Sequence, residues 1–385
     1  MNCIHVSPTL PFDVNGIGYY AYMLGESIRN NYSISNSYIS ILKPILPIIP
    51  IEKKPIYLSD GSGLLSQAVR VALLDLEGPT CLIINFDIGI YDDSRNKWLS
   101  KTFRLPVFLL KSLREIKTIE NLKIVIIYHE YSFTIRERRE YFLRPLQKLL
   151  FKRLLRLSDF SVCSNPVVGD YLSLLNKNAK VLVHPVFSNI GEQPKLEPLL
   201  KKDDHWVIFG SSDNIIKALT SLEKDISILR DQYQVGTLYV VGGLRNIHIE
   251  NLCEGLKNYI SSILYLPNVH KDEVSKIFSV CRFCYMFYFG VLKADFPYLL
   301  FKSSVFAAAC SHGTIPVLGH TNLESLVDFK NHPGIISKNY LGKYSSFSSK
   351  QFEQYSLSLS QWYLENSSLA SLTGKFWQMI KLSCT

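Results

Sequence analysis

The sequence predicts an α/β protein of two domains, each built on a parallel β-sheet. The chain has 385 residues, which is enough for two ordinary domains. Short apolar runs rich in β-branched and aromatic residues alternate with segments of helical spacing, a pattern that favours parallel sheets covered on both faces. A polar segment without an apolar run, residues 188–204, separates two groups of such strands and is interpreted as the interdomain linker.

The strands follow in two groups. Residues 1–12 are interpreted as a strand and a loop, and the runs at 81–86, 123–129, 160–163 and 181–187 complete an N-terminal domain over residues 1–187. The runs at 205–210, 237–243 and 283–289 predict a C-terminal domain over residues 205–350. Residues 351–382 have helical spacing with a break expected near Gly374, and 351–385 are expected to cross back toward the N-terminal domain.

Composition excludes several classes of protein. Apolar residues make up 47% and charged residues 19%, which excludes extended disorder, and the net charge of +9 favours anionic partners. The eight cysteines lack framework spacing and are interpreted as reduced thiols in a cytoplasmic protein. Cys281 and Cys284 form a C-x-x-C without a second pair, so buried thiols are favoured over a metal site. The N-terminus lacks a signal-peptide pattern, and no apolar stretch is long enough to span a membrane.

Ligands of such sheets bind beyond the carboxyl ends of the strands, so the turns there are the candidate sites. Gly16 and Gly18 precede a helical pattern and would let backbone approach a ligand, although an ordinary turn fits as well. His129 and Glu130 end the apolar run at 123–129. A histidine there can bond a hydroxyl or phosphate, and a packing histidine is the alternative.

A third turn follows the run at 205–210. Gly210 and Ser211 come directly after this strand, and Lys217 lies one turn into the following helix. Backbone amides together with an ammonium group suit a diphosphate. The alternative is a solvated lysine on a helix surface.

A fourth turn lies before the small-residue helix that ends near Gly313. Ser303 or Ser304 can cap this helix, and Lys302 stands beside them. The same helix start is a candidate anion site, because its unpaired N–H groups and positive dipole end would point at the ligand. A cap that only closes the helix is the alternative.

A basic segment covers residues 136–156. Eight arginines and lysines against two glutamates give it a net charge of +6, and its leucines recur at helical spacing. An amphipathic helix on an anionic bilayer is one interpretation, and a domain helix whose apolar stripe packs on the sheet is the other. Nucleic-acid binding is not expected, because no basic stripe interleaved with aromatic residues occurs.

The order of these motifs resembles that of the two-domain GT-B glycosyltransferases, especially the retaining family 4. The resemblance covers nearly the whole chain. Residues 11–28 resemble the glycine-rich first loop that faces the acceptor, the segment ending at His129 resembles the strand near the donor sugar, and residues 206–219 resemble the phosphate loop of the donor domain. It implies two Rossmann-like domains with parallel sheets that face a cleft.

The resemblance also implies an activity. A sugar would pass from a nucleoside diphosphate sugar to a hydroxyl of a carbohydrate or lipid-linked acceptor with retention, in polysaccharide or glycoconjugate synthesis. His129 and Lys217 would be catalytic, and Gly16, Gly18 and Glu130 would lie on the acceptor side. The donor would be held by Gly210, Ser211, Lys217, Asp295, Lys302, Ser303 and Ser304. No bound cofactor, metal or nucleic acid is expected, and the location would be cytoplasmic, with peripheral attachment to the inner face of the membrane left open.

Two departures from the family leave alternatives open. Ser211 stands where members carry a basic residue, and Leu300 and Ala308 stand where members carry two glutamates eight residues apart. Residues 303–313 resemble a branch with the pattern S-x-x-A-A-x-x-H-G, which lacks the second glutamate, and Asp295 is then the nearest upstream carboxylate for the ribose. The alternatives are a non-catalytic GT-B partner or sugar-binding subunit, and a GT-B sugar-nucleotide epimerase.

Overall fold

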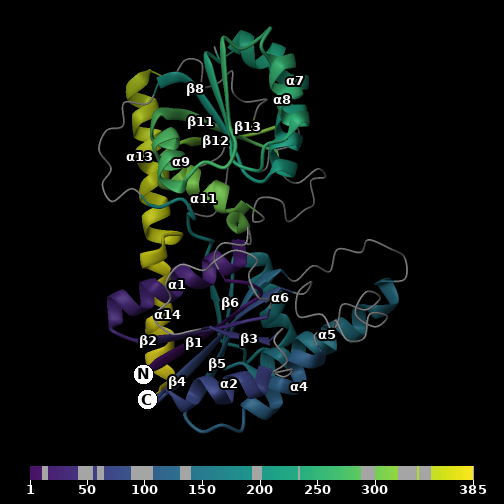
Figure 1. Cartoon of the computed structure of the whole chain (residues 1–385), viewed down its shortest axis with the longest axis vertical. Coiled ribbons are helices and arrows are strands. Elements are labelled where there is room, and N and C mark those ends of the chain that lie inside the picture. Colours follow the sequence, from purple (N-terminus) through teal and green to yellow (C-terminus); the bar gives the residue numbers. More distant parts are fainter. Residues whose placement is uncertain are drawn as a thin grey trace. The chain divides into compact units, whose positions relative to one another are not determined.

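A computed structural model describes residues 1–10, 16–41, 55–58, 65–87, 107–130, 140–192, 202–232, 235–287, 300–319, 336–337 and 348–384. The chain divides into two compact units, Met1–Pro185 with Leu372–Thr385, and Val186–Ser371 (Figure 1). Each unit contains one parallel sheet with helices packed against it. The predicted α/β class with two parallel sheets is therefore confirmed.

Within the described residues, the sheet of the first unit has the strand order β3-β2-β1-β4-β5-β6-β7. The strands are β1 (Asn2–Ser7), β2 (Ser35–Ser40), β3 (Ile56–Tyr57), β4 (Thr80–Asp87), β5 (Leu122–Glu130), β6 (Phe160–Cys163) and β7 (Val181–Val183). All these pairings are parallel. The carboxyl ends of the strands therefore lie along one edge of the sheet.

The helices of the first unit include one from the far end of the chain. They are α1 (Gly16–Tyr32), α2 (Leu65–Leu74), α4 (Val107–Ile116), α5 (Glu140–Leu157), α6 (Pro166–Leu175) and most of α14 (Leu369–Cys384). In α14, the ring of Trp377 stacks on Tyr32 of α1 at 4.6 Å between centroids, and Thr373 Oγ1 lies 2.9 Å from Ser27 Oγ. These contacts fix the C-terminal helix beside α1.

Aromatic rings join α5 to the first sheet. Phe151 of α5 contacts Phe86 of β4 at 5.7 Å and Tyr128 of β5 at 6.0 Å between ring centroids. All three rings are buried. One stripe of α5 therefore belongs to the core of the first unit, since such rings bury a large apolar area.

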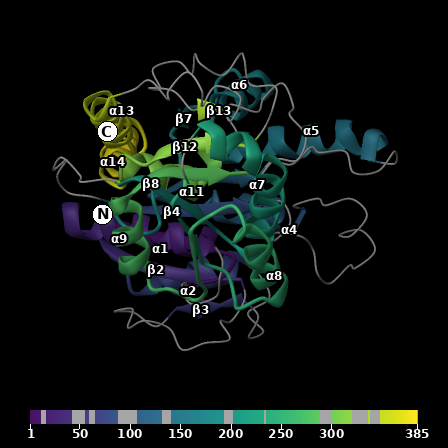
Figure 2. The same ribbon diagram turned by 90° about the horizontal axis from the view of Figure 1, so that it is seen from above.

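The sheet of the second unit has the strand order β10-β9-β8-β11-β12-β13 within the described residues. The strands are β8 (Lys202–Phe209), β9 (Thr237–Val241), β10 (Ser262–Leu266), β11 (Cys281–Met286), β12 (Ile315–Leu318) and β13 (Ile336–Ser337), and all these pairings are parallel. The helical segments are α7 (Ser212–Gln232), α8 (Ile247–Leu256), α9 (Lys271–Val280), η2 (Leu300–Lys302), α11 (Ser304–Ser311) and α13 (Ser349–Asn366). Helices α7 and α8 cover one face of the sheet, and α9 and α13 cover the other (Figure 2).

The segment 188–204 was predicted to be a linker, and its two ends belong to the second unit. Ser188 and Ile190 are buried, and the Ser188 amide donates a 2.9 Å hydrogen bond to the Tyr363 hydroxyl of α13. At the other end, β8 begins at Lys202. Residues 193–201 lie outside the described part of the chain.

The predicted helix break near Gly374 is wrong. Helix α13 ends at Asn366, and the Ser367 and Ser368 amides both donate to the Tyr363 carbonyl. The Ser368 hydroxyl then accepts from the Ser371 amide at 3.1 Å, which caps the start of α14. Gly374 lies inside α14, since one interior glycine costs a helix only about 1 kcal/mol and does not by itself end it.

Candidate functional site

The carboxyl edge of the first sheet carries a side-chain network on β4 and β5. Asn85 Nδ2 donates a 3.2 Å hydrogen bond to the Val6 carbonyl of β1, and Asn85 Oδ1 lies 3.0 Å from His129 Nε2. Because the Val6 carbonyl can only accept, Nδ2 must face it and Oδ1 must face the ring. His129 Nε2 therefore carries a hydrogen and donates it to Asn85 Oδ1.

Helix α1 completes this edge. The ring of Tyr20 meets His129 edge-on, with centroids 4.8 Å apart and planes at 85°. At Gly18 the helix lies close to the backbone of Thr9, so that a Cβ on Gly18 would collide with the Thr9 carbonyl oxygen. A Cβ on Gly16 would meet nothing within 4 Å. The structure thus brings the Gly18 end of α1 and His129 together within the first unit.

Glu130 is the last residue of β5, and its backbone is in register with Asp87 of β4. The Glu130 side chain and the loop 11–15 lie outside the described residues. Sequence reasoning did not single out Asn85 or Tyr20, although both contact His129. Asn85 stands inside an otherwise apolar run. A polar side chain at that position was the one available signal for it.

At the carboxyl edge of the second sheet, two glycine turns meet. Gly210 follows β8 with φ +152°, and Gly242 and Gly243 follow β9 with φ +100° and +64°. A Cβ on Gly242 would lie 2.6 Å from the Gly210 carbonyl oxygen, and one on Gly243 would lie 2.9 Å from the Ser212 amide nitrogen. Any side chain at these two positions would therefore push the turns apart.

Helix α7 starts at this meeting point. The Ser211 carbonyl accepts from the Ile215 amide at 2.9 Å, and the Ser212 hydroxyl accepts from the Leu244 amide at 3.2 Å. The Ser211 side chain is exposed, as is Lys217 farther along the helix. Asp213 is an acidic residue in the first turn, so the local charge is mixed. The N–H groups of the first turn and the Lys217 ammonium are the groups at this turn whose chemistry suits an anion.

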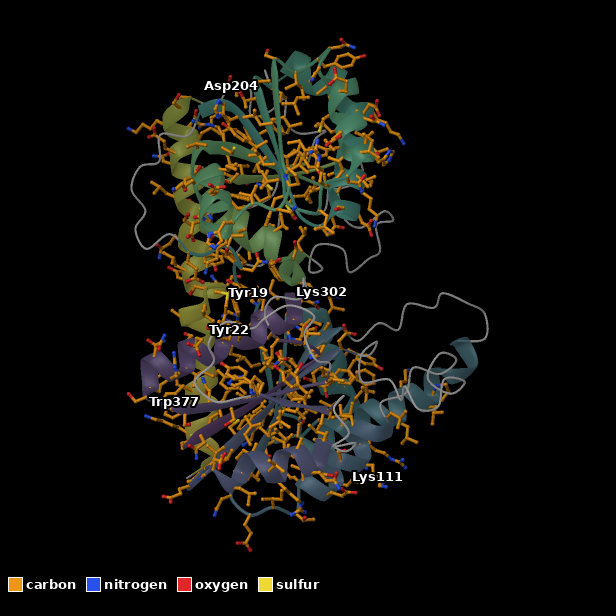
Figure 3. All side chains as sticks on the ribbon, viewed as in Figure 1. Tyr19, Tyr22, Lys111, Asp204, Lys302 and Trp377 are labelled. Atoms are coloured by element: carbon orange, nitrogen blue, oxygen red, sulfur yellow. The ribbon has the colours of Figure 1, made fainter. Side chains whose placement is uncertain are left out.

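The start of α11 is the second candidate anion site that the sequence predicts in this unit. Ser303 Oγ accepts from the Phe306 amide at 3.2 Å, so this serine caps the helix, and Ser304 is its first residue. Lys302 is half-buried at the end of η2. Figure 3 shows Lys302 at the end of this unit opposite to Asp204, which lies near the amino end of β8. Lys302 therefore lies toward the same edge as the Gly210 turn.

Asp295, Cys281 and Cys284 are the remaining residues that the sequence analysis considered as ligands. Asp295 lies outside the described residues. Cys281 and Cys284 are buried, and burial raises the pKa of the Cys284 thiol, which favours the neutral core form. Among the residues that the structure describes, no three His, Cys, Asp or Glu gather in a group that could hold a metal ion, and no helix is long and apolar enough to cross a bilayer.

Comparison with known proteins bears on the fold. No protein-family model and no curated protein matches the sequence. Sucrose-phosphate synthase from Thermosynechococcus elongatus is similar over 100% of both chains, at 12% identity and a TM-score of 0.59. HepE from Anabaena, solved with UDP and glucose, is similar over 99% of both chains, at 10% identity and a TM-score of 0.56.

A glycosyltransferase from Rickettsia africae is similar over 99% of this chain and 98% of its own, at 12% identity and a TM-score of 0.56. At such identities the likeness concerns the fold, since one fold hosts many activities. The chain has the α/β fold of the GT-B glycosyltransferases, with two units that each contain a parallel sheet.

Proposed function

We propose that the protein is a retaining glycosyltransferase of the family 4 type, which moves a sugar from a nucleoside diphosphate sugar to an acceptor hydroxyl. The observation that carries the proposal is the start of α7, where the Gly210 and Gly242 turns pack backbone against backbone. Amide N–H groups at such a helix start can bind an anion. HepE, which shares the fold, was solved with UDP and glucose.

The donor diphosphate is assigned to the second unit. The amides at the start of α7 and the Lys217 ammonium would bind one phosphate, and Lys302 with the start of α11 would bind the other. Negative charge grows on the departing diphosphate in the transition state. Fixed cations and helix N-termini stabilise that charge, so the reaction would need no protein nucleophile and no metal.

The sugar and the acceptor are assigned to the first unit. His129 would hold a donor-sugar hydroxyl, and the network through Asn85 fixes the ring for that contact. Gly16, Gly18 and Glu130 would lie on the acceptor side, with a carbohydrate or lipid-linked glycan as acceptor. We place this activity in cytoplasmic synthesis of a polysaccharide or glycoconjugate, because such donors are phosphate esters that the basic chain would attract.

Donor turnover is the direct test. The protein is incubated with UDP-, GDP- and ADP-sugars without acceptor, and the proposal predicts slow hydrolysis of one donor. Binding without any turnover would instead identify a non-catalytic subunit, and a rearranged donor would identify an epimerase. Where a donor and an acceptor are found, NMR of the product distinguishes a retained anomeric configuration from an inverted one.

Calorimetry with matched variants tests the diphosphate site. Lys217→Ala removes a charge-assisted contact worth roughly 1.5–3 kcal/mol, so nucleoside diphosphate affinity is expected to fall by about 10- to 150-fold. Lys224→Ala is the control, since Lys224 is exposed on the same helix and lies two turns farther from its start. Equal affinities of the two variants would remove Lys217 from the site.

A further inference from the structure

Helix α5 has two faces with different surroundings. Leu150, Phe151, Leu154 and Leu155 are buried in the first unit, which is the packing role that a domain helix would have. The opposite face carries side chains that the core does not cover. The exposed residues on it are Leu146, Lys148, Leu149, Lys152, Arg153 and Arg156, and together they form what we call the basic face of α5.

The basic face combines positive charge with exposed apolar area. Its four cations stand in a stretch, residues 141–158, that contains no Asp or Glu. Within the described part of the chain, none of these four cations forms an ion pair. Leu146 and Leu149 are 40% and 43% exposed. The helix extends outward from the first sheet in both ribbon views (Figures 1 and 2).

Helical spacing places the two leucines among the cations. Leu149 and Lys152 are three residues apart, as are Leu146 and Leu149, while Leu149 and Arg153 are four apart. Residues at these spacings are neighbours on a helix surface. The exposed leucines are therefore flanked by cations that form no ion pair with the described residues, on a surface that faces away from the core.

We propose that the basic face of α5 docks the protein on an anionic lipid bilayer. A bilayer surface offers both partners that this face requires, since phosphate headgroups complement the cations and acyl chains receive the leucines. A nucleic acid would complement the cations but would leave the leucines in water. The proposal concerns an attachment surface and does not depend on the glycosyl transfer proposed above.

Sedimentation of the full-length protein with vesicles tests the charges. Wild type is expected to bind vesicles of phosphatidylcholine with one quarter phosphatidylglycerol at low salt and to dissociate from them in about 0.5 M salt. It should not bind vesicles of pure phosphatidylcholine. Each basic residue near an anionic surface contributes roughly fivefold, so Lys148→Gln with Lys152→Gln should weaken binding by about 25-fold. Lys276→Gln with Lys350→Gln is the control, because both lysines are exposed in the second unit.

Replacement of the leucines separates a bilayer from another polyanion. Leu146→Ser with Leu149→Ser should weaken vesicle binding by roughly tenfold while retention on heparin stays unchanged. Melting temperature and donor hydrolysis should match wild type in both variants, because all four positions are exposed. Absence of vesicle binding at low salt, or vesicle binding that the control and test variants share equally, would overturn the proposal. Equal vesicle binding by wild type and the leucine variant would overturn it as well.

Discussion

At the carboxyl edge of the first sheet, the Asn85 side chain joins Val6 to His129, whereas at the same edge of the second sheet Gly210 and Gly242 meet through backbone atoms. The first arrangement fixes the orientation of the His129 ring. The second places the amide N–H groups at the start of α7 beside a backbone contact between two glycine turns. We infer that the first edge suits recognition of a particular hydroxyl, and that the second suits a phosphate group whatever is attached to it.

The two edges are expected to be sensitive to different substitutions. An edge made from backbone excludes even a methyl group, because a Cβ on Gly242 would lie 2.6 Å from a carbonyl oxygen. At the first edge, by contrast, the position of the His129 ring depends on one side-chain hydrogen bond with Asn85.

Gly242→Ala should give the largest loss of stability. The positive φ of +100° and the contact with the Gly210 carbonyl each cost about 1–3 kcal/mol, so the free energy of unfolding should fall by roughly 2–6 kcal/mol. Gly374→Ala is the matched control, because a Cβ there meets nothing within 4 Å, and it should stabilise α14 by about 0.5–1 kcal/mol. Urea unfolding measures both, and similar values for the two variants would contradict the close packing of the turns.

Acid should destabilise the protein through a buried histidine of the first unit. Burial lowers the pKa of His5 from 6.5 to about 4, so the folded state holds a neutral ring that the unfolded state protonates more readily. Stability is therefore full above pH 6.5, falls as the pH drops toward 4, and loses about 3 kcal/mol from this group. Urea unfolding at pH 7 and pH 4.5 measures the loss. His5→Leu should reduce the difference between the two pH values, and an unchanged difference would refute the assignment.

His129→Ala should separate turnover from nucleotide binding. If the ring contacts the donor sugar in the transition state, turnover should fall on the order of 100-fold while nucleoside diphosphate affinity stays nearly unchanged. Asn85→Ala should follow the same pattern with a smaller loss, because Asn85 positions the ring. Melting temperature is measured on the same samples. A His129 variant with a lowered melting temperature and full activity when folded would show a packing role instead.

Gly18→Ala should give the smallest loss, about 1–3 kcal/mol of unfolding free energy, because its Cβ would strike the Thr9 carbonyl and move the start of α1. Gly16→Ala serves as the control at the same helix end, where a Cβ has open space. Thermal melting compares the two. The close approach of α1 to the sheet would be wrong if Gly16→Ala were the more destabilised variant.

Features encoded over short stretches of chain were predictable. The strand at 206–209, the glycine after it and the helix that carries Lys217 follow one another directly, and the structure has all three in that order. The alternation of strands and helices likewise predicted parallel sheets. Ser303 was left open between a helix cap and an anion ligand, and the structure shows the cap.

Features that join distant residues were not predictable. The Asn85 contact with His129 links positions 44 residues apart, and Asn85 stands in a run whose other residues indicated only a buried strand. Tyr20 lies even farther along the chain from the ring that it contacts. The Gly374 break failed for a local reason, because the serine caps at 367 and 368 act through backbone geometry that spacing does not reveal.

Hydrogen exchange measured with and without nucleotide tests whether the carboxyl edge of the second sheet holds a nucleoside diphosphate. UDP, GDP and ADP are each added at saturating concentration, and peptides are compared across the second unit. The account predicts that one nucleotide slows exchange in residues 210–217 and 300–306 but not in residues 271–280 of α9. Slowed exchange confined to α9, or no change with any of the three nucleotides, would contradict it.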